Sequence, residues 1–360
     1  MEKHHVVAVA TLSIVAAASY YFYKNVDRFK DTQRASKFRN LIPAAISALY
    51  PSTKVLGEGS FAVVFAGGVN NKFAIKVIPR QIMSNNGDLH EFSEEYLQKE
   101  LDILHRVHHK NILNLVDSQW TKDALILVTE NCRGGVLFDK IVEIGTYNED
   151  VAKHIFIEMV NAVEYLHNVA NVIHRDLKPE NILLMNDGSI RICDFGVSKM
   201  WTKKQDDGTK EKSTKEKGTK QKKRSKRQAF QKKSLRTSTV TGTPGYQAPE
   251  MQNGDSDYGT KVDMWSLGII LHAMLGGELP VCIPPQYASE DWNHVSQDAK
   301  DLITSLCDVD ENVRPSASAV LESNWLQVNN EKGGRRKSRD GKEMWDIVKM
   351  KLKVVRAKGK

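Results

Sequence analysis

Two short polar segments near the middle of the chain carry residue types suited to handling phosphate and a divalent cation. One reads His174-Arg175-Asp176-Leu177-Lys178-Pro179-Glu180-Asn181, and the other is Asp194-Phe195-Gly196. Mg²⁺ prefers hard oxygen ligands and keeps several waters, so one carboxylate and one amide suffice when phosphate oxygens complete its shell. A lysine beside them adds positive charge. Together the segments contain an acid, a cation and two metal ligands.

A glycine-rich segment upstream has the composition of a turn that closes over phosphate. It reads Gly57-Glu58-Gly59-Ser60-Phe61-Ala62-Val63-Val64, and apolar residues on both sides predict a strand, a tight turn and a strand. Glycine allows backbone amides to meet phosphate oxygens with no Cβ in the way. The segment Phe73–Ile78, which contains Ala74-Ile75-Lys76, alternates as a strand does. Each segment is weak evidence alone, because most glycine-rich loops are only turns.

Taken in order, these segments resemble the signature of eukaryotic protein kinases over residues 50–326. The resemblance implies an α+β, bilobal protein kinase fold, with a small antiparallel-sheet lobe above a mainly helical large lobe. The stretch 295–303, followed by Trp325-Leu326, is most similar to the calcium/calmodulin-dependent kinase group. The serine/threonine pattern, rather than the tyrosine pattern, is carried by two further segments, Lys178-Pro179-Glu180 and Gly242-Thr243-Pro244-Gly245-Tyr246.

The resemblance implies a protein serine/threonine kinase, with ATP and Mg²⁺ as cofactors and protein hydroxyls as phosphate acceptors. Asp176 is then the base that accepts or orients the substrate hydroxyl proton. Lys178 stabilises the γ-phosphate, and Thr243 completes the catalytic group. The metal ligands are Asn181 and Asp194.

The resemblance also assigns residues to the nucleotide. Lys76 contacts the α- and β-phosphates and pairs with Glu100, which lies on a predicted helix over residues 93–107. Thr129 falls at the gatekeeper position before the adenine-binding hinge. The implied ATP-binding residues are Leu56, Gly57, Glu58, Gly59, Ser60, Phe61, Ala62, Val64, Ala74, Lys76, Thr129, Glu130 and Cys132.

Two positions depart from the family pattern. Ala62 stands where the third glycine of the loop is usual, which predicts a slightly stiffer lid. Val136 replaces an acidic residue that often reaches the ribose or a basic substrate residue. A strict requirement for a basic residue upstream of the phosphorylated position is therefore not implied, although Glu180 remains available.

Arg175, next to the catalytic acid, implies a cationic pocket for a phosphate on the activation segment, because an arginine fork pairs well with a doubly charged phosphate. The candidate phosphorylation sites are Thr239, three residues before Gly242, and its neighbour Thr237.

The activation segment, residues 197–241, is unusually long and contains a basic insert over 203–233. Residues 203–236 hold 15 Lys/Arg against four Asp/Glu, so this stretch carries more positive charge than the net +8 of the whole chain. Few apolar residues and high charge predict disorder. The insert is either a plain solvated segment or a site for anionic lipid or an acidic partner. Nucleic-acid binding is disfavoured, because no aromatic residues are interleaved for stacking.

The N-terminus begins with an apolar segment, and basic residues follow it. Residues 6–23 form an 18-residue apolar run broken only by Thr11, Ser13 and Ser19. This length is near the lower limit for a membrane-spanning helix. Residues 1–24 are predicted as a single-pass membrane anchor and 25–49 as a basic linker, which places the kinase domain in the cytoplasm. A cleaved signal peptide ending near Ala16-Ala17-Ala18, or a buried helix, are the alternatives.

The C-terminal tail, residues 327–360, is basic and ends in a predicted amphipathic helix over 342–358. Such a helix packs on its own domain, binds calmodulin as an autoinhibitory element, or lies on a membrane. A composition of 41% hydrophobic residues fits a packed globular protein. Four scattered cysteines provide neither a disulfide framework nor a zinc-site spacing, which indicates a reducing compartment.

Overall fold

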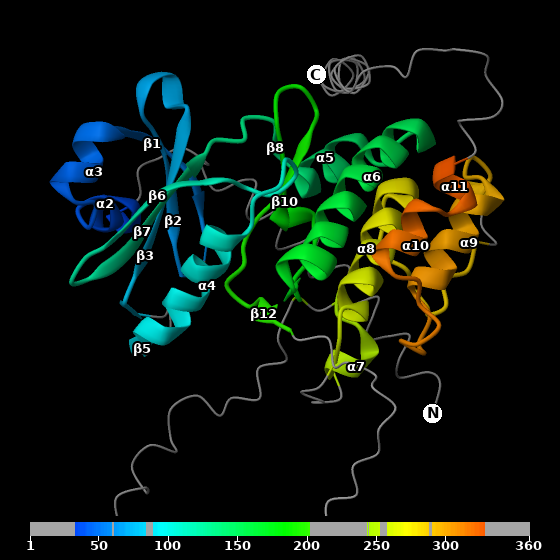
Figure 1. Ribbon diagram of the computed structural model, residues 1–360. Coiled ribbons are helices and arrows are strands. Elements are labelled where there is room, and N and C mark those ends of the chain that lie inside the picture. The colour runs from blue at the N-terminus through cyan, green and yellow to red at the C-terminus, as the bar shows by residue number, and fades with distance from the viewer. Residues whose placement is uncertain are drawn as a thin grey trace, which may run out of the picture.

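The structure is a computed structural model that describes residues 33–59, 61–83, 89–201, 243, 245–252, 258–287 and 290–327. Figure 1 shows a small lobe built around a sheet and a larger lobe built mainly from helices. This arrangement confirms the predicted α+β, bilobal kinase fold. The expectations for the anchor (1–24), Ser60, the insert (203–233), Thr237, Thr239 and the tail helix (342–358) lie outside the described residues.

The small lobe contains a five-stranded antiparallel sheet in the order β1-β2-β3-β7-β6. Its strands are β1 (Ser52–Glu58), β2 (Val63–Gly67), β3 (Phe73–Pro79), β7 (Ala124–Glu130) and β6 (Leu115–Trp120). The register pairs Lys76 of β3 with Val64 on one side and with Leu127 on the other. The glycine-rich loop joins β1 to β2, and β2 pairs directly with β3, the strand that carries Lys76.

The two faces of β3 serve different parts of the small lobe, because successive side chains of a strand point to opposite faces. Ile75 and Val77 belong to a buried cluster on the outer face of the sheet. Ile78 packs with the main core, which includes residues of α4 (Glu94–Arg106). Lys76 shares the parity of Ile78 and therefore extends toward α4 and the cleft.

Two N-terminal helices, α2 (Gln33–Arg39) and α3 (Ala44–Leu49), cover the outer face of this sheet (Figure 1). The prediction of a basic linker over residues 25–49 is therefore wrong for residues 33–49. Four residues of this segment are buried against the sheet at a spacing of three or four positions: Ala35 and Phe38 on α2, Ile42 between the helices, and Ile46 on α3. Basic residues between these positions hid the pattern. We call this pair of helices the N-terminal cap.

The large lobe is organised around α8 (Lys261–Gly276), of which residues 262–275 are all buried. A helix that is apolar on every side belongs in the centre of a core. Around it lie α5 (Leu137–Ile144), α6 (Glu149–Tyr165), α7 (Pro249–Gln252), α9 (Gln297–Leu306), α10 (Ala317–Leu321) and α11 (Asn324–Gln327). In the described residues no helix is both long enough and apolar enough to cross a membrane.

Short strands complete the connections between the lobes. A three-stranded sheet contains β8 (Gly135–Val136), β10 (Ile182–Leu184) and β11 (Ile190–Ile192), and a second pair joins β9 (Val172–Ile173) to β12 (Lys199–Met200). A small hairpin, β4 (Gln81–Met83) with β5 (Leu89–Glu91), precedes α4. These strands support the loops that carry the predicted catalytic residues.

A buried ion pair ties the segment after the activation segment to the far end of the large lobe. The guanidinium of Arg314, which is only 1% exposed, donates from Nη1 and Nη2 to the two oxygens of Glu250, at 2.6 and 2.8 Å. Two parallel bonds fix both distance and orientation. α7 is therefore held in place next to α8.

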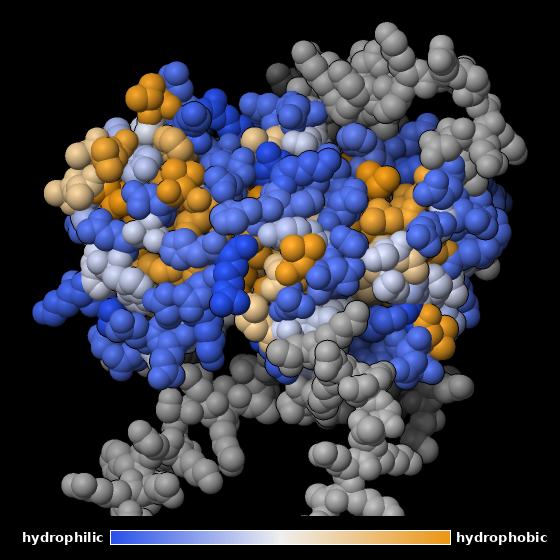
Figure 2. All heavy atoms as spheres, in the orientation of Figure 1, coloured by the Kyte–Doolittle hydropathy of each residue, from blue (hydrophilic) through white to orange (hydrophobic). Residues whose placement is uncertain are grey.

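The packing of the cap predicts that Ile46 contributes to stability. Ile46→Ala should lower the free energy of unfolding by about 2 kcal/mol, since the side chain is 3% exposed and its removal leaves a cavity. Leu49→Ala on the same helix is the matched control. Leu49 is 67% exposed, in the region where Figure 2 shows apolar side chains at the surface around α3. Denaturant unfolding of both variants is the measurement, and equal effects would contradict the described packing.

Candidate active site

The backbone of the catalytic loop is held in place by one buried carboxylate at the start of α8. Asp263 accepts hydrogen bonds from the backbone N–H of His174 at 2.9 Å and of Arg175 at 2.8 Å. The ring of His167 contributes a third contact, 2.8 Å from Asp263 Oδ2. Burial opposes ionisation of Asp263, but the bond to His167 and the nearby positive charge outweigh it, so its pKa is lowered. The loop is therefore fixed by an ionised group.

The ring of His174 links the catalytic loop to the segment that carries Asp194. Its Nδ1 lies 3.3 Å from the N–H of Asp176, which donates to it, and its Nε2 lies 3.1 Å from the carbonyl of Cys193. Nδ1 is therefore an acceptor and Nε2 a donor. The backbone on both sides is bent into the left-handed region, with φ of 70° at Arg175 and 68° at Asp194. Such strain persists only where the surroundings hold it.

Asp176, Lys178 and Thr243 form a closed triangle of polar contacts. Asp176 Oδ1 accepts from both the N–H and the hydroxyl of Thr243, each at 3.0 Å. The Lys178 ammonium lies 2.8 Å from Asp176 Oδ2 and 2.6 Å from the Thr243 hydroxyl oxygen. The structure thus brings together the three residues that the resemblance assigned to catalysis in this part of the site.

The two predicted metal ligands have the chemistry that Mg²⁺ requires. The amide nitrogen of Asn181 donates to the Asp176 carbonyl at 2.8 Å and to its Oδ2 at 3.2 Å, which reserves the amide oxygen for another partner. The side chain of Asp194 is 49% exposed, and the Lys76 charge holds its pKa below the ordinary value. One amide oxygen and one ionised carboxylate fit a magnesium ion whose other ligands come from phosphate and water.

The described residues contain no cluster of three or more His, Cys, Asp or Glu side chains that would hold a metal by itself. A metal at Asn181 and Asp194 would take its remaining ligands from the nucleotide and from water. This is the way Mg²⁺ is usually held beside phosphates.

Lys76 connects the two lobes. Its ammonium lies 2.7 Å from Glu100 Oε1 on α4 and 3.4 Å from Asp194 Oδ1. Burial alone would lower the pKa of Lys76, but the two carboxylates raise it above its ordinary value. The ion pair that was expected between Lys76 and Glu100 is formed. It sets the distance between α4, β3 and the segment of Asp194.

The glycines of the nucleotide loop are not required by the packing of the protein itself. A Cβ added at Gly57 would meet no atom within 4 Å, and one at Gly59 would lie 3.7 Å from the Ala62 carbonyl. Neither glycine has a positive φ. The absence of side chains at these two positions leaves open the space that phosphates would occupy. Val64 and Ala74, on facing strands behind the loop, are half-buried.

The predicted hinge residues Thr129, Glu130 and Cys132 do not all face the same way. Thr129 is buried, and its hydroxyl donates to the Glu130 carbonyl at 3.2 Å. Burial raises the pKa of Cys132 to about 12, so the thiol stays protonated and unreactive at neutral pH.

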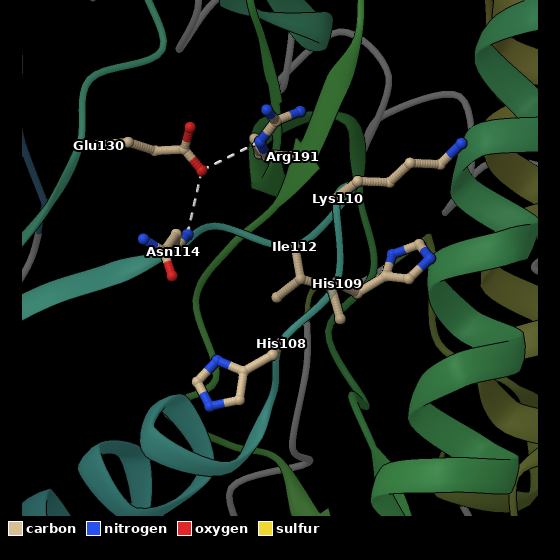
Figure 3. Close-up of a pocket in the computed structure, with 7 residues that line it drawn as sticks. All are labelled: His108, His109, Lys110, Ile112, Asn114, Glu130 and Arg191. Carbon is tan, nitrogen blue, oxygen red and sulfur yellow. Dashed lines mark hydrogen bonds and ion pairs between the residues drawn. The ribbon is translucent and has the colours of Figure 1, made fainter.

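The side chain of Glu130 points into a pocket of about 350 Å³ behind the hinge. Figure 3 shows its carboxylate between Arg191 and Asn114. One oxygen accepts from Arg191 Nε at 3.0 Å and from the Asn114 N–H at 3.1 Å. The other residues of this pocket are His108, His109, Lys110 and Ile112. These contacts stabilise the hinge from outside the cleft.

Two residues that the sequence reading did not assign support the site. Arg175 donates from Nη1 to the Tyr258 hydroxyl oxygen at 3.1 Å, and His167 contacts Asp263. Neither is part of a recognisable motif, so the spacing along the chain held no signal for them.

Comparison with known proteins gives the same assignment as the geometry. The family model described as "Protein kinase domain" matches residues 50–326. Myosin light chain kinase A of Dictyostelium discoideum is 34% identical over 86% of this chain and 95% of its own length. Calcium/calmodulin-dependent protein kinase type 1 of Caenorhabditis briggsae is 31% identical over 80% of this chain and 76% of its own. The type II enzyme of Schizosaccharomyces pombe is 32% identical, over 77% and 57%.

The triangle around Thr243 predicts a role for its hydroxyl. Thr243→Val keeps the shape and the backbone bond to Asp176 but removes the bonds to both charged groups. It should lower kcat by about tenfold or more, because a bond to a charged group contributes ~1.5–3 kcal/mol. Thr243→Ser restores the hydroxyl and should stay within about threefold of the natural protein. Steady-state phosphate transfer to a peptide tests both, and equal losses would exclude a role for the hydroxyl.

Proposed function

We propose two properties of this chain, which belongs to the protein kinase family and is an ATP-dependent serine/threonine kinase. A phosphate on its activation segment raises its activity, and its N-terminus anchors it in a membrane. The kinase activity follows from the family match and from the serine/threonine kinases among its relatives. The observation that carries the regulatory proposal is the environment of Arg175, beside the catalytic acid.

We assign the substrate hydroxyl to Asp176. A carboxylate has about four lone-pair sites, and contacts from Thr243, Lys178 and Asn181 use them. In this proposal the Lys178 ammonium turns to the γ-phosphate when ATP is present, which opens Oδ2 to the hydroxyl. Asp176 then takes the proton of the substrate hydroxyl. The hydroxyl oxygen forms a bond to the γ-phosphorus while the bond from that phosphorus to the ADP oxygen breaks.

Lys76 is assigned to the α- and β-phosphates, with Glu100 holding its ammonium in position. Asn181 and Asp194 would hold Mg²⁺, which would neutralise charge on the phosphates. The groups of the large lobe in this assignment sit on segments that the contacts around Asp263 and His174 hold in place. The protein therefore contributes orientation and charge rather than covalent chemistry.

Arg175 supports the regulatory proposal because its guanidinium meets only neutral oxygen atoms among the described residues. Its Nε donates to the Val197 carbonyl at 2.6 Å, and its Nη1 meets the Tyr258 hydroxyl. Among the described residues, no carboxylate forms an ion pair with it. A phosphate on the activation segment would supply that charge and order the segment that presents substrate. Thr239 is the proposed site, with Thr237 as the neighbouring candidate.

The membrane proposal rests on the apolar run over residues 6–23 and the basic residues after it. The N-terminal cap begins at Gln33, so only residues 24–32 separate the proposed span from the kinase. Such an anchor would hold the small lobe close to the membrane surface, with the domain in the cytoplasm.

Activation by phosphate predicts a specific coupling. Thr239→Ala should lower activity roughly fivefold or more, because the charge-assisted bonds to Arg175 are lost. In an Arg175→Ala background the same change should have no further effect, since both substitutions remove one interaction. Thr237→Ala tests the neighbouring candidate and should leave activity near that of the natural protein; a comparable loss would assign the phosphate to Thr237 instead. Peptide phosphorylation by each purified variant is the measurement.

Deletion of residues 203–233 should keep basal activity. This result would show that the insert is not needed for activation by the phosphate on Thr239. Asp176→Asn, which removes the proposed base, distinguishes self-phosphorylation from phosphate added by another kinase. Equal losses from Thr239→Ala in both backgrounds would show that Arg175 does not receive a phosphate from that position.

The anchor predicts the location of a reporter. A reporter fused after residue 32 should sediment with membranes, resist carbonate extraction and be accessible to protease from the cytosol. Replacement of Ile14 and Val15 by aspartate should release it, because charge at the centre of a span is costly. A chain that begins at Gln33 should be soluble and active. A secreted or lumenal reporter would instead indicate a cleaved signal peptide.

A further inference from the structure

A side chain of the N-terminal cap reaches the nucleotide loop. Nη2 of Arg34, on α2, donates a hydrogen bond of 2.9 Å to the backbone carbonyl of Gly59. The two residues are 25 positions apart in sequence, and Gly59 is the second glycine of the loop between β1 and β2. This contact joins a segment that precedes the family's domain, residues 50–326, to the loop that covers the phosphates.

The cap gives Arg34 a defined position. Its sequence neighbour Ala35 is fully buried, and Phe38, one helical turn on, is 7% exposed, so the orientation of α2 is fixed by the core beneath it. The Arg34 guanidinium also lies over the Phe38 ring, at 5.2 Å from its centroid. A cation placed over an aromatic face is attracted to it. The buried face of α2 therefore fixes the backbone of Arg34, and the Phe38 ring holds its guanidinium near the loop.

Gly59 is a point at which the loop can be held. Its N–H donates to the Ala62 carbonyl at 2.9 Å, which closes the turn, and its carbonyl is the acceptor for Arg34. No side chain packs it in place, because a glycine has none. Since a peptide group is planar, fixing the carbonyl also fixes the plane of the peptide that follows.

A second contact holds the tip of the loop from the other side of the sheet. The ring of Phe61 meets Phe92 edge-on at 5.2 Å, and Phe92 stacks on Tyr96 of α4 at 5.9 Å. Figure 1 shows α2 and α4 on opposite sides of the sheet. The loop therefore has an apolar tether toward α4 and a polar tether toward the cap.

We propose that Arg34 is a positioning residue for ATP, which holds the glycine-rich loop in the conformation that receives the phosphates. A loop that is already ordered loses less conformational entropy when the nucleotide binds. Without this bond, nucleotide binding must supply the ordering, so the affinity for ATP falls. The groups around Asp176 lie elsewhere and are unchanged, so the transfer step keeps its rate. This inference goes beyond the proposals on phosphate activation and membrane anchoring and depends on neither.

The test compares two cationic residues of the same helix in the full-length protein. Arg34→Ala should raise the KM for ATP roughly two- to fivefold at saturating peptide, the range that one exposed charged hydrogen bond supports, with kcat within about twofold. Arg34→Lys, which keeps the charge and a donor, should recover part of the effect. Lys37→Ala is the control, because Lys37 is exposed on the same helix. Its KM should equal that of the natural protein.

Two further measurements separate positioning from a general loss of structure. Hydrogen–deuterium exchange of peptides covering residues 56–66 should become faster in Arg34→Ala, while peptides from α8 stay unchanged. The melting temperature should match that of Lys37→Ala. An unchanged KM with unchanged exchange would overturn the proposal. So would an equal rise in KM from Lys37→Ala, which would indicate a general effect of charge, or a fall in melting temperature and kcat together.

Discussion

The geometry of the site depends on one carboxylate, that of Asp263, which is completely buried at the start of the central helix. It receives the backbone N–H groups of His174 and Arg175 and so determines where the catalytic loop begins. The next residues of that loop include Asp176 and Lys178. A neutral amide at this position would offer only one acceptor atom for three donors. The loop is therefore built on an ionised group that α8, apolar on all sides, carries into the core.

The second constraint is the distance between the lobes, which Lys76 sets through Glu100 and Asp194. A buried ion pair contributes little net stability, because desolvation of the charges offsets their attraction. Its effect here is on geometry: the small lobe, α4 and the Asp194 segment keep one relative position. The stability comes from the two apolar clusters, one under each face of the sheet.

Much of this site could be predicted from the sequence, because its residues lie in short segments with fixed spacing. Lys76 with Glu100, and Asp176 with Lys178, follow from such segments and from the resemblance that they carry. The N-terminal cap could not be found in the same way. Its apolar residues recur at helical spacing, but the basic residues between them read as a linker, and no motif there identifies a partner surface.

The direction of Glu130 was open to prediction and was missed. Thr129 and Glu130 are neighbours on β7, and alternation in a strand sends them to opposite faces. With Thr129 at the cleft, the carboxylate of Glu130 had to point elsewhere, and it meets Arg191 behind the hinge. The contact between Arg175 and Tyr258 had no such signal, because it joins residues that are 83 positions apart. Long-range polar contacts of this kind follow from the fold and not from local spacing.

The strained residues mark where these constraints meet. Arg175 and Asp194 both have positive φ, which costs a non-glycine residue of order 1–3 kcal/mol. Both flank the His174 ring, and each is bonded to a group on another element, Asp263 for Arg175 and Lys76 for Asp194. A relaxed backbone at either position would turn the side chain away from the polar groups that it contacts. The apolar core and the buried Asp263 thus offset a local cost whose effect is to fix the direction of one cation and one carboxylate on two neighbouring segments.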